Sequence, residues 1–412
     1  MSTLSRFWQV HHIPATGANI LPKTCLLVRH YTFLYYIDLF LSYISRVSVA
    51  LLWKFQRHGK DNTLIVWLLP PSTSTHLSTT LPVDIPPLSR PRPWLLHLLH
   101  VNTMNFCSFA SYVPPTSTAS SPELLIAVPN TLSSETVDIF HLPTQSRIHT
   151  VPNAPGLKGG MVMAIALFIP SSSPSFSPSN NLIVTTAYES GHTTVSALST
   201  TTHTWKHTYL SHPHTQPILS LALSLTPNAC NRDVYFTSSA DANLVKHPIP
   251  PSPSQYLGAE EDVEEIGGIR TGGEIKLVKT GHSGQQSLSV RNDGKIFATA
   301  GWDGRVRVYS VKNMREVAVL KWHGKGCYAV GFADVKCEVP APEGRKGKVK
   351  VGEEVEEEME EEDEEGDEDR SKKVERRMER FMVKHERMQK TRTTHWLAVG
   401  SKDGKVSLWD IF

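Results

Sequence analysis

Short apolar runs followed by an Asp-Gly turn recur along the chain, and each of them predicts a β-hairpin. Phe297–Ala300 precedes the turn at Asp303-Gly304, and the residues that follow alternate between polar and apolar up to Tyr309. The same phrase returns near the end of the chain, where Leu397–Val399 precedes Asp403-Gly404 and the alternation ends at Trp409. Asp-Gly between two such runs is the strongest short-range hairpin signal.

The spacing from the turn aspartate to the last inward-facing residue is constant. An aromatic residue follows Asp303 and Asp403 by six positions, and Trp67 follows Asp61 at the same offset. Asp241 keeps this spacing with a histidine, His247, in place of the aromatic residue.

Weaker hairpins are predicted at Leu124–Val128 with Thr136–Phe140 and at Leu182–Ala187 with Thr193–Ala197. Small, apolar runs upstream fit buried inner strands: Asn105–Phe109, Val162–Phe168, Ile218–Leu223, Ser287–Val290 and Cys327–Phe332.

Six units of about four strands each indicate an all-β repeat protein of the WD40 type. The sequence predicts a WD40-type β-propeller with six legible blades of a seven-blade ring. The resemblance to WD40 repeats implies a buried hydrogen-bond relay of His, Ser/Thr, Asp and an aromatic residue in each blade. The matching residues are His282, Thr299, Asp303 and Tyr309 in one unit, His323, Asp403 and Trp409 in the last, and Asp61 and Trp67 in the first. In the last unit Val399 replaces the hydroxyl.

The expected organisation is an atypical segment at residues 1–49 and a propeller at 50–412. The N-terminal segment lacks a Gly-His turn and a second hairpin, which indicates a faulty gene model or a divergent N-terminus. A ring that ends on Trp409 needs an outer fourth strand from the N-terminus, for which Leu26–Thr32 and Val47–Phe55 are candidates. The apolar stretch Tyr31–Trp53 contains Asp38 and Arg46. No uncharged run in it reaches the ~18 residues that a membrane helix needs, and no membrane association is expected.

Charge is concentrated in a segment predicted to interrupt the last blade at residues 335–393. The chain has 42 basic and 40 acidic residues, yet Glu353–Asp369 holds 14 acidic residues and no basic one. Such a run repels itself, so disorder is expected, with a counter-charge for a basic partner as the alternative. The next residues predict a helix with one apolar face, formed by Val374, Met378, Phe381, His385 and Met388. That helix is a candidate for docking a partner through Val374, Met378, Phe381 and Met388, or it lies on its own propeller or in solvent.

No pattern in the sequence indicates catalysis, a cofactor or a metal. The five cysteines include no Cys-x-x-Cys pair. His203, His207, His212 and His214 lie in a Thr/Pro-rich connection without acidic or thiol partners, so we expect a solvated loop there. An enzyme built on a propeller would need convergent ionisable residues at strand ends. None recurs, which favours a non-catalytic interaction platform.

Several phrases resemble one family of WD40 proteins more closely. They are Arg57–Asn62, then His100–Cys107 with the sequence HVNTMNFC, then Ala300–Arg305, and an acidic insert inside the last blade. Together they resemble the fungal ASTRA-associated protein 1 family. The resemblance implies a nuclear scaffold subunit of the ASTRA complex, a chromatin regulator, with RuvB-like ATPases and a kinase co-chaperone module as partners and no direct contact with nucleic acid. Another WD40 adaptor is the alternative, either a ubiquitin-ligase substrate receptor or a G-protein-β-like scaffold.

Overall fold

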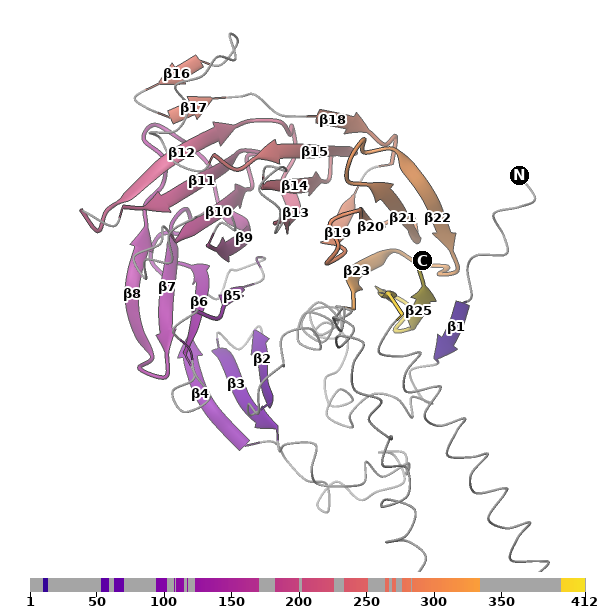
Figure 1. Cartoon of the computed structure of the whole chain (residues 1–412), viewed down its shortest axis with the longest axis horizontal. Helices are drawn as coiled ribbons and strands as arrows, with labels where there is room; N and C mark the ends of the chain where they lie inside the picture. The colour runs from indigo at the N-terminus through magenta and orange to yellow at the C-terminus, as the bar shows by residue number, and fades with distance from the viewer. Residues whose placement is uncertain are drawn as a thin grey trace, which may run out of the picture. The chain divides into compact units, whose positions relative to one another are not determined.

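A computed structural model places strands over the repeated part of the chain. It describes residues 10–13, 53–58, 63–69, 94–101, 107, 109–114, 117, 123–169, 182–199, 202–225, 233–250, 264–266, 269–271, 276–282, 284–333 and 394–411. Every helix or strand assigned within these ranges is a strand. The strands form six sheets, one for each predicted unit. The prediction of an all-β propeller with six legible blades is therefore confirmed (Figure 1).

We number the sheets as blades in chain order. Blade 1 has β2 (Trp53–His58), β3 (Thr63–Leu69) and β4 (Trp94–His100). Blade 2 has β5 (Ala110–Tyr112), β6 (Leu124–Pro129), β7 (Val137–Leu142) and β8 (Ser146–Val151). Blade 3 has β9 (Val162–Phe168), β10 (Ile183–Tyr188), β11 (Thr193–Leu198) and β12 (Trp205–Ser211).

The remaining blades contain the clearest repeats. Blade 4 has β13 (Ile218–Ser224), β14 (Val234–Ser239), β15 (Asn243–Pro248) and β18 (Lys276–Lys279). Blade 5 has β19 (Gln285–Val290), β20 (Ile296–Gly301), β21 (Arg305–Ser310) and β22 (Glu316–Lys321). Blade 6 has β23 (Cys327–Phe332), β24 (Trp396–Ser401), β25 (Val406–Asp410) and, at its outer edge, β1 (Val10–Ile13).

The hairpin turns follow from local sequence chemistry. The side chain of Asp303 accepts a hydrogen bond from the backbone N–H of Arg305, and Asp403 does the same with Lys405. Gly304 follows at a φ of +77°, in the left-handed region that glycine enters without steric cost. The turn aspartate and glycine therefore reverse the chain between the second and third strands of the blade.

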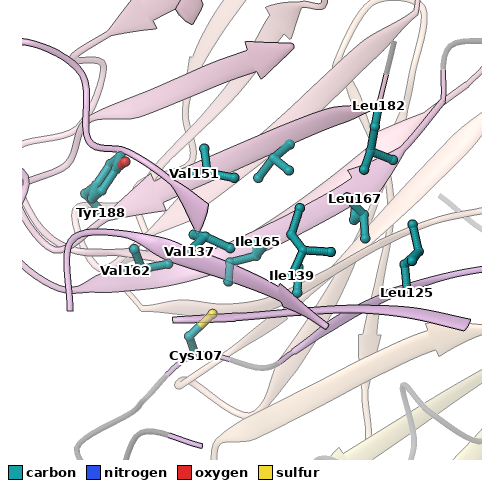
Figure 2. Close-up of a cluster of buried hydrophobic side chains, with 12 residues drawn as sticks. Cys107, Leu125, Val137, Ile139, Val151, Val162, Ile165, Leu167, Leu182 and Tyr188 are labelled. Atoms are coloured by element: carbon teal, nitrogen blue, oxygen red, sulfur yellow. The ribbon is translucent and has the colours of Figure 1, made fainter. Parts of the chain in front are cut away.

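The core lies between neighbouring sheets. The innermost strands β5, β9, β13, β19 and β23 contact one another in chain order. Figure 2 shows one cluster between blades 2 and 3, in which Leu125, Ile139 and Leu167 come from different strands and pack with Tyr188. A second cluster joins Leu64 of blade 1 to Ile126 of blade 2. Burial of apolar side chains between blades therefore links each sheet to the next.

The outer strand that the last blade requires comes from the N-terminus at β1. It pairs antiparallel with β25, with Val10 opposite Trp409 and Ile13 opposite Val406. Of the run Val47–Phe55, the described part Trp53–Phe55 is a strand, but it begins β2 and pairs with β3 in blade 1 rather than with β25. The other candidate, Leu26–Thr32, lies outside the described residues, and so does most of the segment from which a seventh blade would come.

Blade 6 is interrupted between its first and second strands. β23 and β24 pair antiparallel, with Phe332 opposite Leu397, although the two residues are 65 positions apart in the sequence (397 − 332). Contacts along the chain define a second compact unit, Val335–His395 with Ile411–Phe412. Residues 334–393 lie outside the described residues, so the acidic run and the docking helix of Val374, Met378, Phe381 and Met388 stay predictions. Within the described ranges, no helix is long and apolar enough to cross a membrane.

One hairpin was not predicted. β16 (Glu264–Ile266) and β17 (Ile269–Thr271) lie in the connection between β15 and β18 of blade 4. β17 pairs parallel with β12 of blade 3, with Tyr209 opposite Arg270. The sheet of blade 3 therefore has six strands and is fastened to the chain of the next blade.

Candidate functional site

The most complete side-chain relay lies in blade 4. His214 Nδ1 is 3.1 Å from Asp241 Oδ1, and His214 Nε2 is 2.9 Å from Thr237 Oγ1. Thr237 Oγ1 is 3.0 Å from His247 Nε2, and His247 Nδ1 is 3.1 Å from the hydroxyl of Tyr209 in blade 3. Figure 1 shows the two sheets as neighbours. The five groups form one continuous chain from a turn into the space between two blades.

The ionised carboxylate fixes the direction of the first hydrogen bond. A carboxylate only accepts hydrogen bonds, so His214 donates from Nδ1 to Asp241. The Thr237 hydroxyl lies between Nε2 of His214 and Nε2 of His247, and the Tyr209 hydroxyl contacts the other nitrogen of His247. Burial and the nearby His214 hold the pKa of His247 well below its ordinary value. His247 is therefore neutral.

The carboxylate at the end of the relay is stabilised in its charged form. Burial acts to raise the pKa of Asp241, but hydrogen bonds from His214 and from the backbone amides of Asn243 and Thr215 lower it to about 2. The side chain of Asn243 also donates to Asp241 Oδ2 at 3.1 Å. Asp241 therefore holds the turn, the preceding loop and the relay together.

Blade 6 forms a relay with its hydroxyl on a different strand. Trp409 Nε1 donates to Ser407 Oγ at 2.9 Å, and Ser407 Oγ is 2.9 Å from His323 Nε2. His323 Nδ1 is 3.6 Å from Asp403 Oδ2. Ser407 lies directly opposite Val399 in the strand register. The hydroxyl that Val399 cannot supply is therefore provided by its cross-strand neighbour.

Blade 5 departs from the predicted relay. Asp303 binds the buried guanidinium of Arg307 through two contacts, 2.6 Å to Nη2 and 3.2 Å to Nη1. His282 Nδ1 is 3.9 Å from Asp303, and Thr299 donates to Gln285 Oε1 at 2.7 Å instead of to a histidine. Burial opposes a low pKa for Asp303, but Arg307 brings the pKa below its ordinary value. The structure thus replaces the link from histidine to threonine with an ion pair.

The aromatic residue of blade 5, Tyr309, packs in the hydrophobic core. The ring of Tyr309 stacks on Phe297 at 5.1 Å, and Phe297 stacks on Phe236 of blade 4 at 4.6 Å. Burial raises the pKa of the Tyr309 hydroxyl, so the phenol is neutral. Of the first unit, Trp67 lies in β3 and Asp61 lies outside the described residues.

The histidine-rich connection is structured where it was expected to be solvated. His214 is 1% exposed, so the expectation of a solvated loop is wrong for this residue. His207 Nδ1 lies 2.9 Å from Ser196 Oγ, and the ring of His212 stacks on His192 at 3.8 Å. Across the described ranges, no three potential ligands are grouped to hold a metal ion.

Sequence reasoning missed the groups that complete the relays. His214, Thr237, Ser407 and Arg307 carry the contacts, and none was a candidate relay residue. A signal existed for His214, which precedes its inner strand by four positions (218 − 214), as His323 does (327 − 323). It lies between Pro213 and Thr215 rather than beside glycine.

The polar groups of these side chains bind one another, as they do in structural relays. Six repeated sheets, with Asp-based turns and such relays in blades 4 and 6, define a WD40 β-propeller. The profile described as WD domain, G-beta repeat matches residues 274–310 and 391–410. The fold of a crystallised protein, Sqt1 of Saccharomyces cerevisiae, covers 87% of this chain and 68% of its own, with a TM-score of 0.48 and 10% identity.

Sequence comparison identifies the family within this class. The chain is 46% identical to ASTRA-associated protein 1 of Verticillium alfalfae over 358 residues, which cover 86% of this chain and 76% of that protein. It is 42% identical to the protein of the same name in Penicillium rubens over 382 residues, or 86% of this chain and 81% of that one. The chain belongs to the ASTRA-associated protein 1 family.

Proposed function

We propose that this chain is a non-catalytic scaffold subunit of the ASTRA complex. The observation that carries the proposal is the 46% identity to a protein named ASTRA-associated protein 1 over 86% of the chain. The similarity extends over most of the chain and is not confined to one repeat. A role in the same assembly is the function that this similarity supports best.

The side chains of the blades support a structural role over catalysis. His247 and Thr237 are fully buried, and His214 and Asp241 are bound to each other and to neighbouring groups. A general acid or base must reach the proton that it transfers in a bound substrate. Among the described residues, His247 and Asp241 instead contact other residues of the fold.

The proposal includes the setting of the assembly. The resemblance implies a nuclear protein that contacts RuvB-like ATPases and the co-chaperone module of the large phosphatidylinositol-3-kinase-like kinases, in the context of chromatin remodelling. A propeller fits this role because it presents many turns around one rigid core and needs no chemistry of its own.

Affinity purification tests the proposal. The tagged full-length chain replaces the endogenous relative in Verticillium alfalfae, and co-purifying proteins are identified by mass spectrometry. An unrelated WD40 propeller with the same tag is the control. We expect RuvB-like ATPases and the kinase co-chaperone in the sample and not in the control, and nuclear fluorescence for a fusion of the same chain. Recovery of ubiquitin-ligase or G-protein subunits without them would overturn the proposal.

A further inference from the structure

Blades 5 and 6 present equivalent turns side by side. Trp302 follows β20 and Lys402 follows β24, each directly before the turn aspartate. The backbone N–H of Trp302 donates to Gly284 O, and that of Lys402 donates to Gly326 O. Gly326 approaches both turns, because a Cβ added to it would lie 2.9 Å from Trp302 O. The two turns and the loop before β23 therefore form one continuous surface.

An exposed tryptophan is held rigidly on this surface. The side chain of Trp302 is 44% exposed, and its Nε1 donates to Gln286 Oε1 at 2.8 Å. Gly284 lies beneath the indole at a φ of +71°, and a Cβ there would overlap the ring. The ring is thus fixed before any partner arrives, and binding loses little side-chain entropy.

Exposed basic residues lie in the same turns and loop as this tryptophan. The surface, which we call the Trp302 face, consists of Trp302, Arg305, Lys325, Tyr328, Lys402 and Lys405. The four basic side chains are exposed, and Tyr328 is partly exposed. The ammonium group of Lys405 lies 5.6 Å from the centre of the Trp322 ring.

The carboxylates of the same turns offset only part of these charges. Asp303 is bound by the buried Arg307, and Asp403, which faces His323, leaves one negative charge beside the four cations. Within the part of the chain that the structure describes, no ion pair joins Arg305, Lys325, Lys402 or Lys405 to a carboxylate. Four positive charges therefore remain available to a ligand.

We propose that the Trp302 face binds an acidic peptide segment of a partner protein. Tryptophan, tyrosine and arginine are the residues that most often dominate binding energy at protein interfaces. Four unpaired cations in the same turns and loop as a fixed indole fit a short segment in which carboxylates flank an apolar side chain. Complementary charge would also speed association and make it sensitive to salt.

The charge balance of the chain favours an acidic peptide over nucleic acid. The net charge is only +2, and 14 acidic residues lie together in Glu353–Asp369. A net charge this small gives a long polyanion little attraction beyond the four cations. A short peptide can contact the four cations alone.

A titration tests the proposal on the full-length chain. The probe is a fluorescein-labelled 12-residue peptide, Asp-Glu-Leu-Asp repeated three times, and its fluorescence polarisation reports binding. A peptide with Asn and Gln in place of Asp and Glu is the uncharged control. We expect K325E/K402E to weaken binding more than tenfold and W302A to weaken it about tenfold, with an affinity that falls as salt rises.

Matched controls separate the face from general charge. Lys295 and Lys312 are exposed in blade 5, but they lie in the turns at the opposite end of the same strands. K295E/K312E should bind the acidic peptide as the unchanged chain does. Thermal melts of all variants show whether each propeller is folded. A second full-length chain, with Gln and Asn throughout Glu353–Asp369, removes competition from its own carboxylates.

The outcomes distinguish the alternatives. Absence of acidic-peptide binding in both full-length chains, or equal losses in K325E/K402E and K295E/K312E, would overturn the proposal. Tighter binding of a 12-nucleotide oligo-dT that K325E/K402E abolishes would show a nucleic-acid surface instead. The inference rests on the proposed scaffold role only in making the partner a protein. If ASTRA subunits fail to co-purify while the peptide binds, the proposed complex is wrong, but peptide binding by the Trp302 face is still supported.

Discussion

At the scale of single residues, the relays show that the position of a hydroxyl can change while its contact stays. In blade 4 the hydroxyl is on Thr237, with Val245 opposite on the next strand. In blade 6 the order is reversed, with Val399 in the position of the hydroxyl and Ser407 opposite. Either member of a cross-strand pair can place an oxygen near the histidine, since paired residues lie about 5 Å apart. Both blades keep the buried hydrogen bond, because a buried donor or acceptor without a partner lowers the stability of the folded chain.

Removal of the Ser407 hydroxyl tests this reciprocity. S407A leaves Trp409 Nε1 without the acceptor that it has now and removes the contact of His323 Nε2. We expect a loss of roughly 1–3 kcal/mol in the free energy of unfolding, measured by urea denaturation. The double variant V399T/S407A should recover part of the loss, because the hydroxyl returns on the other strand. A neutral S407A would contradict the relay.

Asp303 is expected to stabilise the folded chain through its ion pair with Arg307 and not through a relay. D303A leaves the guanidinium of Arg307, which is 1% exposed, with only Glu316 at 3.8 Å. Because Asp303 itself is partly exposed, we expect the loss of this partner of the buried guanidinium to cost roughly 1–3 kcal/mol. Calorimetric melts should show D303A well below the unchanged chain, and D303A/R307L nearer to it, since the unpaired charge is then gone. Equal melting of D303A and the unchanged chain would exclude a structural ion pair.

The sequence allowed part of these sites to be predicted. The offset of six residues located Asp241 with His247 and Asp403 with Trp409, because turn and strand geometry fix that distance along the chain. Ser407 and Arg307 were missed, because their partners are set by pairing across strands. His214 was missed because the criterion was a glycine beside the histidine, whereas the structure needs only a loop that turns the ring inward.

At the scale of elements, the alternation of polar and apolar residues and the turn residues predicted the hairpins. These local patterns could not predict pairing between strands that lie far apart in the sequence. The pairs β20–β21 and β24–β25 lie where the Asp-Gly phrases placed them. The hairpin of β16 and β17 has three residues in each strand, too few for a visible alternation. Its partner β12 lies about 60 residues away (269 − 211 = 58), so only the assembled blade could show the pairing.

The connection between β23 and β24 gives an element-scale prediction. Deletion of Glu343–Thr391 removes only residues that lie between the two paired strands. We expect the melting temperature to be nearly unchanged, because the entropic cost of closing a loop depends only weakly on its length. Differential scanning fluorimetry of both chains is the measurement. A collapse of the fold would show that the second compact unit contributes to the stability of the propeller.

At the scale of the whole molecule, buried histidines predict how stability depends on pH. Burial lowers the pKa of His149, His192, His207, His247 and His323. Below about pH 6.5 the unfolded chain therefore binds protons that the folded chain does not, and folding weakens as the pH falls. The carboxylate of Asp241 adds a second loss below about pH 4, because its pKa in the folded chain is about 2.

Melting temperatures between pH 7.5 and pH 5 test the first part of this dependence. We expect a steady fall, with a slope of up to about 1.4 kcal/mol per pH unit for each excluded proton. H247Q keeps a donor and an acceptor but does not titrate, so its slope should be flatter. H100Q, at an exposed position, is the control for the same substitution. An H247Q slope equal to the H100Q slope would contradict the assignment.

The pairing of β1 with β25 joins the two ends of the chain in one sheet, and the last prediction concerns this closure. β1 covers the outer edge of β25 over four residue pairs, from Val10 with Trp409 to Ile13 with Val406. An uncovered edge strand exposes backbone donors and acceptors that other chains can bind. A chain that begins at residue 14 should therefore lose roughly 2–4 kcal/mol of ladder hydrogen bonds and self-associate.

A chain that begins at residue 10 is the matched control, because it loses nine residues and keeps β1. We expect it to melt with the full-length chain and to elute as the same species in size-exclusion chromatography. The chain from residue 14 should melt lower and form larger species, since Trp409 and its relay then lie on an open edge. If the two shortened chains behave alike, β1 does not close the blade, and another segment must cover β25.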